Sequence, residues 1–164
     1  MTVLPIDVSK AGELSDLAKA IYVEYYLHLW HPGGADWYMH EHAYHPDKLK
    51  AELSDINNLH LVVYDAGKPM GYLKLKINAT LEELKPGSYL EIERIYLHKA
   101  IAGKGIGKNL MLFSEEIATQ HKKQGIFLKA MDTSKDAIIF YEKMGYTKCG
   151  TLVLPFEQMK EEYR

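Results

Sequence analysis

The sequence has little cysteine, no excess of positive charge and no long apolar run. Cys149 is the only cysteine among 164 residues, which excludes an internal disulfide framework and is typical of a reducing compartment. Lys and Arg number 20 against 22 Asp and Glu, so the charge does not favour a nucleic acid partner. No stretch is apolar enough to span a membrane, and the N-terminus shows no signal peptide pattern. We therefore expect one cytoplasmic domain over residues 1–164, with no membrane partner.

The first third of the chain combines helical patterning with many aromatic residues. Val3 to Asp7 is predicted to form a short strand. Apolar residues then recur at helical spacing from Leu14 to Leu29, and Pro32-Gly33-Gly34 is expected to end this helix. Residues 35–45 have no clear period and are expected to be irregular, whereas Pro46 suits the first turn of a second helix over about 47–54.

The remaining two thirds alternate strand and helix patterns. Residues 59–65 and 70–77 predict a hairpin with a short loop. Further strands are predicted over 89–97, 126–131 and 146–154, and further helices over about 106–121 and 134–144. Antiparallel strands followed by strand, helix, strand, helix and strand predict a mixed α/β sandwich of helices around one sheet.

A glycine-rich loop, Ala102-Gly103-Lys104-Gly105-Ile106-Gly107, separates the strand over 89–97 from the next helix. Glycine tolerates a positive φ and allows a ligand to approach the backbone closely. Amides at a helix entrance favour an anion, and Lys99, Lys104 and Lys108 add positive charge nearby. The pattern therefore indicates either a phosphate site or an ordinary turn that precedes a helix.

Two common phosphate motifs do not fit this loop. The triphosphate loop requires a glycine where Ala102 stands, and a Ser or Thr where Asn109 follows Lys108. The dinucleotide fingerprint fails because its last glycine would fall on Lys108 or Leu110. A different phosphate-containing ligand is therefore expected.

A second block supports a more specific interpretation. From Ser134 to Tyr146 the chain follows the order Ser-x-x-Ala-x-x-Phe-Tyr-x-x-x-Gly-Tyr. Together with Gly105 and Gly107, this resembles the GNAT family of N-acetyltransferases, whose second motif begins with Asn and whose pyrophosphate loop begins with Gln or Arg in place of Ala102. Within the family, residues 71–75 and 89–112 look most like the polyamine or diamine acetyltransferase branch.

The resemblance implies a fold, a cosubstrate and an activity. The fold class is α/β (α+β), a mixed and mostly antiparallel central sheet with helices on both faces. The cosubstrate is acetyl-CoA, and a primary amine attacks the thioester directly in a ternary complex. The strand over 89–97 should splay open there, so that its backbone pairs with the pantetheine amides and the Leu97 N–H donates to the thioester carbonyl. The cofactor-binding residues implied are Ile95, Tyr96, Leu97, Ala102, Gly103, Lys104, Gly105, Ile106, Gly107, Lys108, Ser134 and Tyr141.

Three residues are candidates for proton transfer. Glu91 and Glu93 lie two apart on one strand and so share a face, and in the family this register carries the base or orders a water that carries the proton. Their mutual repulsion would raise the pKa of at least one of them; the alternative is a solvated strand face. Tyr141 is the candidate general acid, because a phenol with a pKa of about 10 stays protonated at neutral pH. Its alternative role is a core aromatic, since Phe140 and Tyr141 are not expected to face the core together.

The resemblance also implies that the aromatic segment before residue 46 is the wall of the acceptor site, since this helix–loop–helix is the variable substrate region of the family. Aromatic rings with Asp36 and Glu41 would suit a small cationic amine such as a polyamine, while a packed loop or a dimer contact is the alternative. No metal is expected, although His28, His31, His40, His42 and His45 cluster here. The substrate-binding residues predicted are Tyr26, Trp30, Trp37, Tyr38 and Glu41.

The end of the chain departs from the family pattern. The family adds a further strand, whereas residues 157–163 look helical. Either the final strand is missing, or a neighbouring subunit of a homodimer covers that edge of the sheet. A non-catalytic CoA-binding or regulatory module, and an enzyme that acetylates a protein N-terminus or lysine, remain alternative functions.

Overall fold

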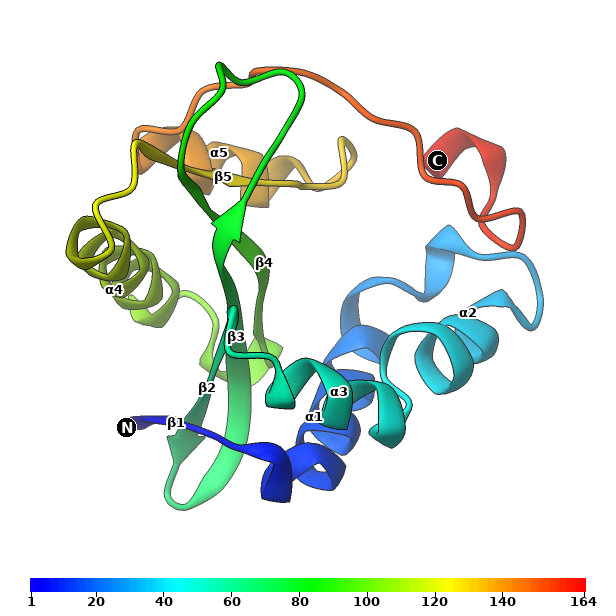
Figure 1. Ribbon diagram of the computed structural model, residues 1–164. Helices are drawn as coiled ribbons and strands as arrows, with labels where there is room; N and C mark the ends of the chain where they lie inside the picture. Colours follow the sequence, from blue (N-terminus) through cyan, green and yellow to red (C-terminus); the bar gives the residue numbers. More distant parts are fainter.

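A computed structural model describes all residues, 1–164, and a five-stranded sheet lies at its centre (Figure 1). The strand order follows the sequence from β1 to β5. The first four strands pair antiparallel, and β4 and β5 pair parallel. The prediction of a mixed, mostly antiparallel sheet is therefore confirmed. The strands are β1 (Thr2–Pro5), β2 (Asn58–Asp65), β3 (Lys68–Ala79), β4 (Tyr89–Leu97) and β5 (Gly125–Leu128).

Helices cover both faces of this sheet. The α-helices are α1 (Ala11–Tyr25), α2 (Gly34–Trp37), α3 (Pro46–Ser54), α4 (Ile106–Gln120) and α5 (Lys135–Lys143). The shorter helices are η1 (Val8–Lys10), η2 (Leu27–Leu29), the π-helical η3 (Tyr38–Ala43), η4 (Lys99–Ile101) and η5 (Glu161–Tyr163). Figure 1 shows α1 and α3 on one side of the sheet and α4 on the other.

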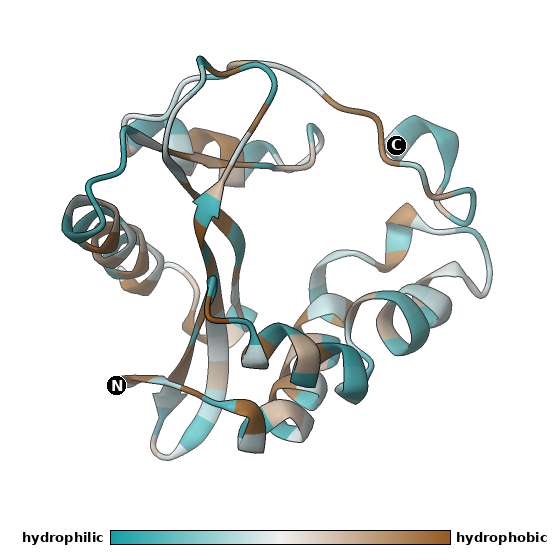
Figure 2. Cartoon of the chain, viewed as in Figure 1, coloured by the Kyte–Doolittle hydropathy of each residue, from teal (hydrophilic) through white to brown (hydrophobic).

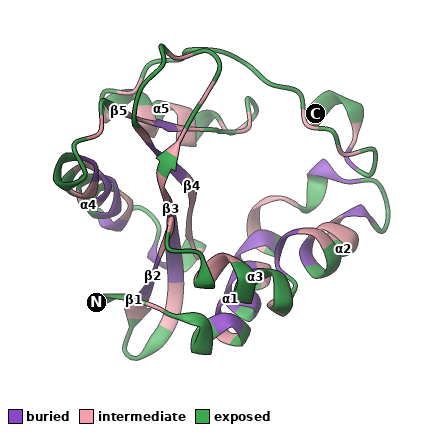
Figure 3. Cartoon of the chain, viewed as in Figure 1, coloured by how far each residue is buried: buried purple, intermediate pink, exposed green.

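Strand alternation divides the apolar side chains into two cores. Val62 and Tyr72 pack with α1, α3 and the aromatic residues of the first third of the chain. Val63, Leu73 and Leu75 point to the opposite face and pack against α4. Figure 2 shows the apolar residues concentrated along these central strands, and Figure 3 shows the same strands as the buried centre of the molecule.

The hairpin between β2 and β3 forms as its sequence predicts. Asp65 pairs with Lys68 across a two-residue loop. Ala66 and Gly67 both have positive φ, at 50° and 77°, which matches the twist of the flanking strands.

The aromatic segment is more helical than expected. The first helix ends at Tyr25, because Tyr26 leaves the helical region at φ −125°, and not near Pro32. Residues 34–43 form α2 and η3 where an irregular stretch was predicted. Met39 and Ala43 become buried in this way, so tertiary packing determines a helix that local periodicity does not show.

The predicted strand over 146–154 is wrong. These residues form no strand or helix, and Figure 1 shows them crossing from α5 toward the region of α2. The chain then docks by backbone hydrogen bonds from His31 N to Gln158 O and from Lys160 N to Leu29 O. No strand follows β5 in the sheet, so it lacks both the strand predicted over 146–154 and the further strand of the family pattern.

Candidate functional site

A cavity of about 890 Å³ opens between α1, β4, the glycine loop and α5. The end of the chain contributes Leu154, Phe156 and Met159 to its wall. Residues from six separate parts of the sequence therefore meet around one space, and most of the predicted site residues are among them.

The divergence of β4 and β5 creates this opening. The two strands pair only from Tyr89 to Ile92, opposite Gly125 to Leu128. Beyond Ile92, β4 remains paired with β3 on one edge alone. Ile95, Tyr96 and Leu97 line the cavity here, so the predicted splay at this strand is confirmed. The unpaired edge is available to a ligand that can hydrogen bond like a strand.

The glycine loop borders the cavity at the start of α4. Gly103 and Gly105 have φ of +76° and +83°, a region that side chains rarely adopt. Gly105 is the N-cap of α4, and no side chain caps this helix. The first amides of α4 are thus free to bind an anion.

Most of the loop residues predicted to bind the cofactor line the cavity. They are Ala102, Gly103, Gly105, Gly107 and Lys108. Ile106 instead belongs to the core at 9% exposure, and Lys104 is exposed outside the cavity lining. The Lys104 ammonium and the Ile106 side chain are therefore not part of the cradle, which consists mainly of backbone.

The helix α5 supplies Ser134, Phe140 and Tyr141 to the same cavity. Ser134 occupies the N-cap position, but its side chain makes no capping hydrogen bond and so stays available to a ligand. The expectation that Phe140 and Tyr141 cannot both face inward is wrong, because both line the cavity and pack on one core. Burial raises the pKa of Tyr141, which keeps its hydroxyl protonated at neutral pH.

Glu93 reaches the cavity through an irregularity in β4. Lys74 pairs with Arg94 and the next residue, Leu75, pairs with Ile92, so Glu93 is an extra residue in the strand. Such a bulge re-aims a side chain. Glu93 lines the cavity, and its Oε2 lies 2.8 Å from Lys74 Nζ and 3.7 Å from Lys76 Nζ.

The expected repulsion between Glu91 and Glu93 is absent. Burial raises the pKa of Glu93, but contact with Lys74 and the charges of Arg94 and Lys76 outweigh burial and lower it below its ordinary value. Glu91 is 5% exposed, lies outside the cavity lining and pairs with Lys129 at 3.6 Å. Each carboxylate therefore has its own cation, and only Glu93 is placed to meet a ligand.

Lys74 is a site-associated residue that the sequence did not reveal. It is 2% exposed and contacts Glu52 at 3.3 Å in addition to Glu93. Arg94 joins the same cluster at 3.0 Å from Glu52 and lies over the Tyr44 ring. The alternation of Lys74 and Lys76 with leucines suggests a solvated face, but Lys74 is buried, with Glu52 of α3 beside its ammonium.

The aromatic wall contains only two of the residues predicted to bind the acceptor. Of the five predicted acceptor residues, Tyr26 and Tyr38 line the cavity. Trp30 is buried at 4% exposure and donates from Nε1 to the Tyr22 hydroxyl at 2.9 Å, while Trp37 packs beside Phe156. Glu41 is exposed outside the cavity. The aromatic residues that do line it are Tyr22, Tyr25, Tyr26, Tyr38, Tyr96, Phe140, Tyr141 and Phe156.

The histidine-rich segment does not converge. No group of three or more His, Cys, Asp or Glu side chains is arranged to hold a metal ion. His28 lies beside Tyr163 at the cavity, and His42 stacks on Trp37. None of the helices is long and apolar enough to cross a lipid bilayer.

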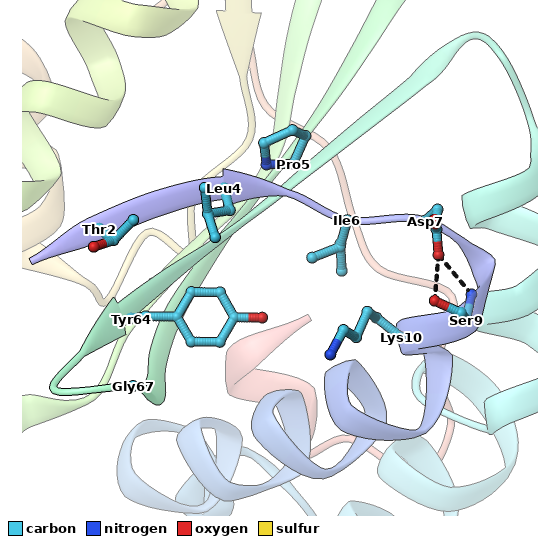
Figure 4. Close-up of a pocket in the computed structure, with 9 residues that line it drawn as sticks. All are labelled: Thr2, Leu4, Pro5, Ile6, Asp7, Ser9, Lys10, Tyr64 and Gly67. Atoms are coloured by element: carbon cyan, nitrogen blue, oxygen red, sulfur yellow. Dashed lines mark hydrogen bonds between the residues drawn. The ribbon is translucent and has the colours of Figure 1, made fainter.

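A second, smaller cavity of about 450 Å³ lies beside β1 (Figure 4). Its polar groups are already engaged, since Asp7 accepts from the N–H and hydroxyl of Ser9 and Lys10 pairs with Glu13. It shares no lining residue with the large cavity. The candidate site is therefore the cavity beside the glycine loop.

Comparisons with known proteins identify relatives of this chain. The chain is 35% identical over 109 residues to an uncharacterised N-acetyltransferase from the pepI 3′ region of Lactobacillus delbrueckii subsp. lactis. The match covers 66% of this chain and 62% of the relative, so the chain spans about three fifths of that relative's length.

Solved structures share the fold at low sequence identity. A mutant of the BH1408 protein from Bacillus halodurans has a TM-score of 0.73 and 19% identity, covering 95% of this chain and 99% of its own. The aminoglycoside N-acetyltransferase AAC(6')-Iy, solved in complex with CoA, has a TM-score of 0.71 and 10% identity, covering 96% of this chain and 94% of its own. Residues 21–146 also match the profile of the Acetyltransferase (GNAT) family. Because that match covers most of the sequence, the chain belongs to the Acetyltransferase (GNAT) family.

Proposed function

We propose that this protein transfers the acetyl group of acetyl-CoA to the nitrogen of a small primary amine. One observation carries the proposal: the unpaired edge of β4 and the uncapped start of α4 border the same cavity. A strand edge suits the pantetheine amides, and the start of a helix suits a pyrophosphate. Family membership and the CoA complex of the aminoglycoside enzyme support this choice of cosubstrate.

The residues of this chain would hold the cosubstrate mainly through backbone groups. Residues 95–97 would pair with the pantetheine, and the amides around Gly103 to Lys108 would bind the pyrophosphate. Acetyl-CoA, when bound, supplies an acyl thioester carbon that an amine nitrogen can attack. The Leu97 N–H is our choice of donor to the carbonyl oxygen, although Leu97 O already accepts from the Tyr25 hydroxyl at 2.9 Å.

Glu93 would act as the proton acceptor and Tyr141 as the proton donor. Glu93 is held ionised by Lys74 and can accept a proton from the ammonium, directly or through a water. Tyr141 stays protonated and can donate to the departing sulfur. Overall, the ammonium gives one proton to Glu93, which releases it to solvent, and the amine nitrogen bonds to the acetyl carbon. The carbon–sulfur bond breaks as Tyr141 protonates the sulfur, and the second proton lost from the nitrogen restores the Tyr141 hydroxyl. Glu91 has no part in this scheme, because it lies outside the cavity lining.

The shape of the site supports a small acceptor. Phe156 and Met159 from the end of the chain extend the wall formed by Tyr38 and Tyr22. A protein N-terminus or lysine side chain would need an open groove. A polyamine, which the sequence suggests, is one small acceptor. The charged side chains around the cavity help to decide between a polyamine and other small amines.

Release of free thiol from acetyl-CoA, measured across a panel of small amines, tests the proposal. We expect amine-dependent release and a product one acetyl group heavier by mass spectrometry. Calorimetry with CoA alone provides the control for binding. Tight CoA binding with no amine-dependent release would contradict the proposal and favour a non-catalytic CoA-binding module.

A further inference from the structure

The acceptor end of the cavity, formed by α1, β4 and the end of the chain, has no surplus of negative charge. Glu93 is the one carboxylate that β4, α1 and the end of the chain contribute to the lining. It pairs with Lys74 and Lys76, while Glu52 behind it pairs with Arg94 and Lys74. Three cations therefore face two carboxylates, and no negative charge is left over for a second ammonium group.

The acidic residues expected to attract a polycation lie elsewhere. Asp36 and Glu41 are exposed and do not line the cavity. Asp136 does line it, but it is exposed, lies in the first turn of α5 and has Lys135 beside it. Burying a second ammonium against the aromatic wall would thus leave it without an anionic partner, which is costly.

The wall itself is one continuous aromatic surface. The Tyr22 ring lies 4.9 Å from Tyr26 and 5.0 Å from Tyr38, and Tyr26 lies 5.9 Å from Tyr96. Phe156 extends the surface at 5.8 Å from Tyr38. These spacings are those at which a further aromatic ring packs favourably.

The hydroxyl groups on this wall do not add charge. Burial, with a contribution from nearby Tyr141, raises the pKa of Tyr26 to about 12. Burial also raises the pKa of Tyr38. The wall is therefore neutral at physiological pH and offers apolar faces with a few hydroxyls.

We propose that the acceptor is a primary monoamine carried on an apolar, preferably aromatic, body of the arylalkylamine class, and not a polyamine. The inference rests on the proposed acetyl transfer at this cavity. The amine nitrogen would meet Glu93, and the ring would pack against Tyr26, Tyr38 and Phe156. Fully burying a phenyl group is worth about 1.5–3 kcal/mol, so the ring contributes roughly tenfold or more to kcat/KM.

Matched amines test this inference with the unmodified protein. Pentylamine and 1,5-diaminopentane have the same chain and differ in one ammonium group, and 2-phenylethylamine adds the ring. We expect kcat/KM for pentylamine to exceed that for the diamine at least about tenfold, with 2-phenylethylamine higher still and spermidine lowest. Equal or better use of the diamine or spermidine would overturn the inference while leaving the proposed acetyl transfer intact. No thiol release with any amine would overturn both.

A variant of the wall provides a second test. Phe156→Glu adds one carboxylate at the cavity, and Phe156→Leu controls for loss of the ring. We expect Phe156→Glu to narrow the preference for pentylamine over 1,5-diaminopentane at least about threefold relative to Phe156→Leu, because the diamine gains an anionic partner. The same preference in both variants would contradict the charge argument.

Discussion

The two ends of the cavity are built on different principles. The cofactor end uses neighbouring residues, from Ala102 to Lys108, and mainly their backbone. The acceptor end uses side chains from α1, η3, β4 and the final residues, which are distant in sequence. A short motif therefore predicts the first end well, whereas the second depends on how the whole chain folds.

Tyr141→Phe tests the junction of the two ends and should have the largest effect. Tyr141 lines the cavity from α5 and is near Tyr26 on the acceptor side. Loss of a general acid costs roughly 10²–10⁴-fold, so we expect kcat to fall by about 100-fold or more with little change in the affinity for CoA. Steady-state kinetics with calorimetry would measure both.

Tyr146→Phe is the matched control. Its ring lies 6.3 Å from Tyr141, but it does not line the cavity. We expect nearly unchanged kcat. A loss of less than about threefold in Tyr141→Phe would exclude that hydroxyl as the acid.

Gly105→Val breaks the backbone cradle without touching the acceptor end. Gly105 has φ +83°, where a β-branched side chain is strained. We expect CoA affinity to fall about tenfold or more, since the left-handed conformation costs roughly 1–2 kcal/mol. Gly107→Ala is the control, because its added Cβ would meet Phe140 at 3.6 Å, an ordinary contact. Equal losses in the two variants would argue against a conformational role.

Lys74→Met changes the pKa of Glu93 while leaving the Glu93 side chain in the protein. Glu93 acts as a base only when ionised, so activity is lost as the pH falls through its pKa. That pKa is now held low; without Lys74, burial dominates and the pKa rises. We expect the acid limb of the kcat/KM profile to move about one unit to higher pH. Lys76→Met should shift it less, because Lys76 is 38% exposed and 3.7 Å away. An unmoved acid limb in Lys74→Met would remove Glu93 as the titrating base.

Ala102→Arg should have the smallest effect of these variants, and it should increase the affinity for CoA. Ala102 is exposed at the cofactor end and stands where the family pattern carries Gln or Arg. A guanidinium there adds a charged partner for a pyrophosphate, worth about 1 kcal/mol at an exposed position. We expect CoA to bind roughly threefold to fivefold tighter by calorimetry. Weaker binding would mean that the pyrophosphate lies elsewhere.

The sequence predicted what local patterns determine. The hairpin at Ala66-Gly67, the loop at Gly103 to Gly107 and the helix carrying Tyr141 each depend on adjacent residues. Family resemblance added the splay of β4. These features position the cosubstrate, so the cofactor end was largely predictable.

The acceptor end could not be predicted from the sequence, because its geometry depends on contacts between residues that are far apart in the chain. The bulge at Glu93 results from the pairing of β3 with β4, and Lys74 is buried at ion pairs with Glu52 of α3 and Glu93 of β4, which are distant from it in sequence. Trp30 resembled a binding residue but is a core residue bonded to Tyr22. Phe156 lies between the strand predicted over 146–154 and the helical residues predicted over 157–163, and it joins the wall through backbone pairing near Trp30 and Met159.

The sparse packing of α5 has a consequence for motion. The helix contains no buried residue, and beyond Gln120 only Phe127 and Met159 are buried. Local opening should therefore require less free energy here than in α4, and the amides of α5 should exchange their hydrogens with solvent sooner. A ligand held between the glycine loop and Ser134 would slow that exchange. The helix α5, which carries Tyr141, would then become more ordered when the cosubstrate binds. The packing of α5 against the bound cosubstrate could then be the rate-limiting step of turnover.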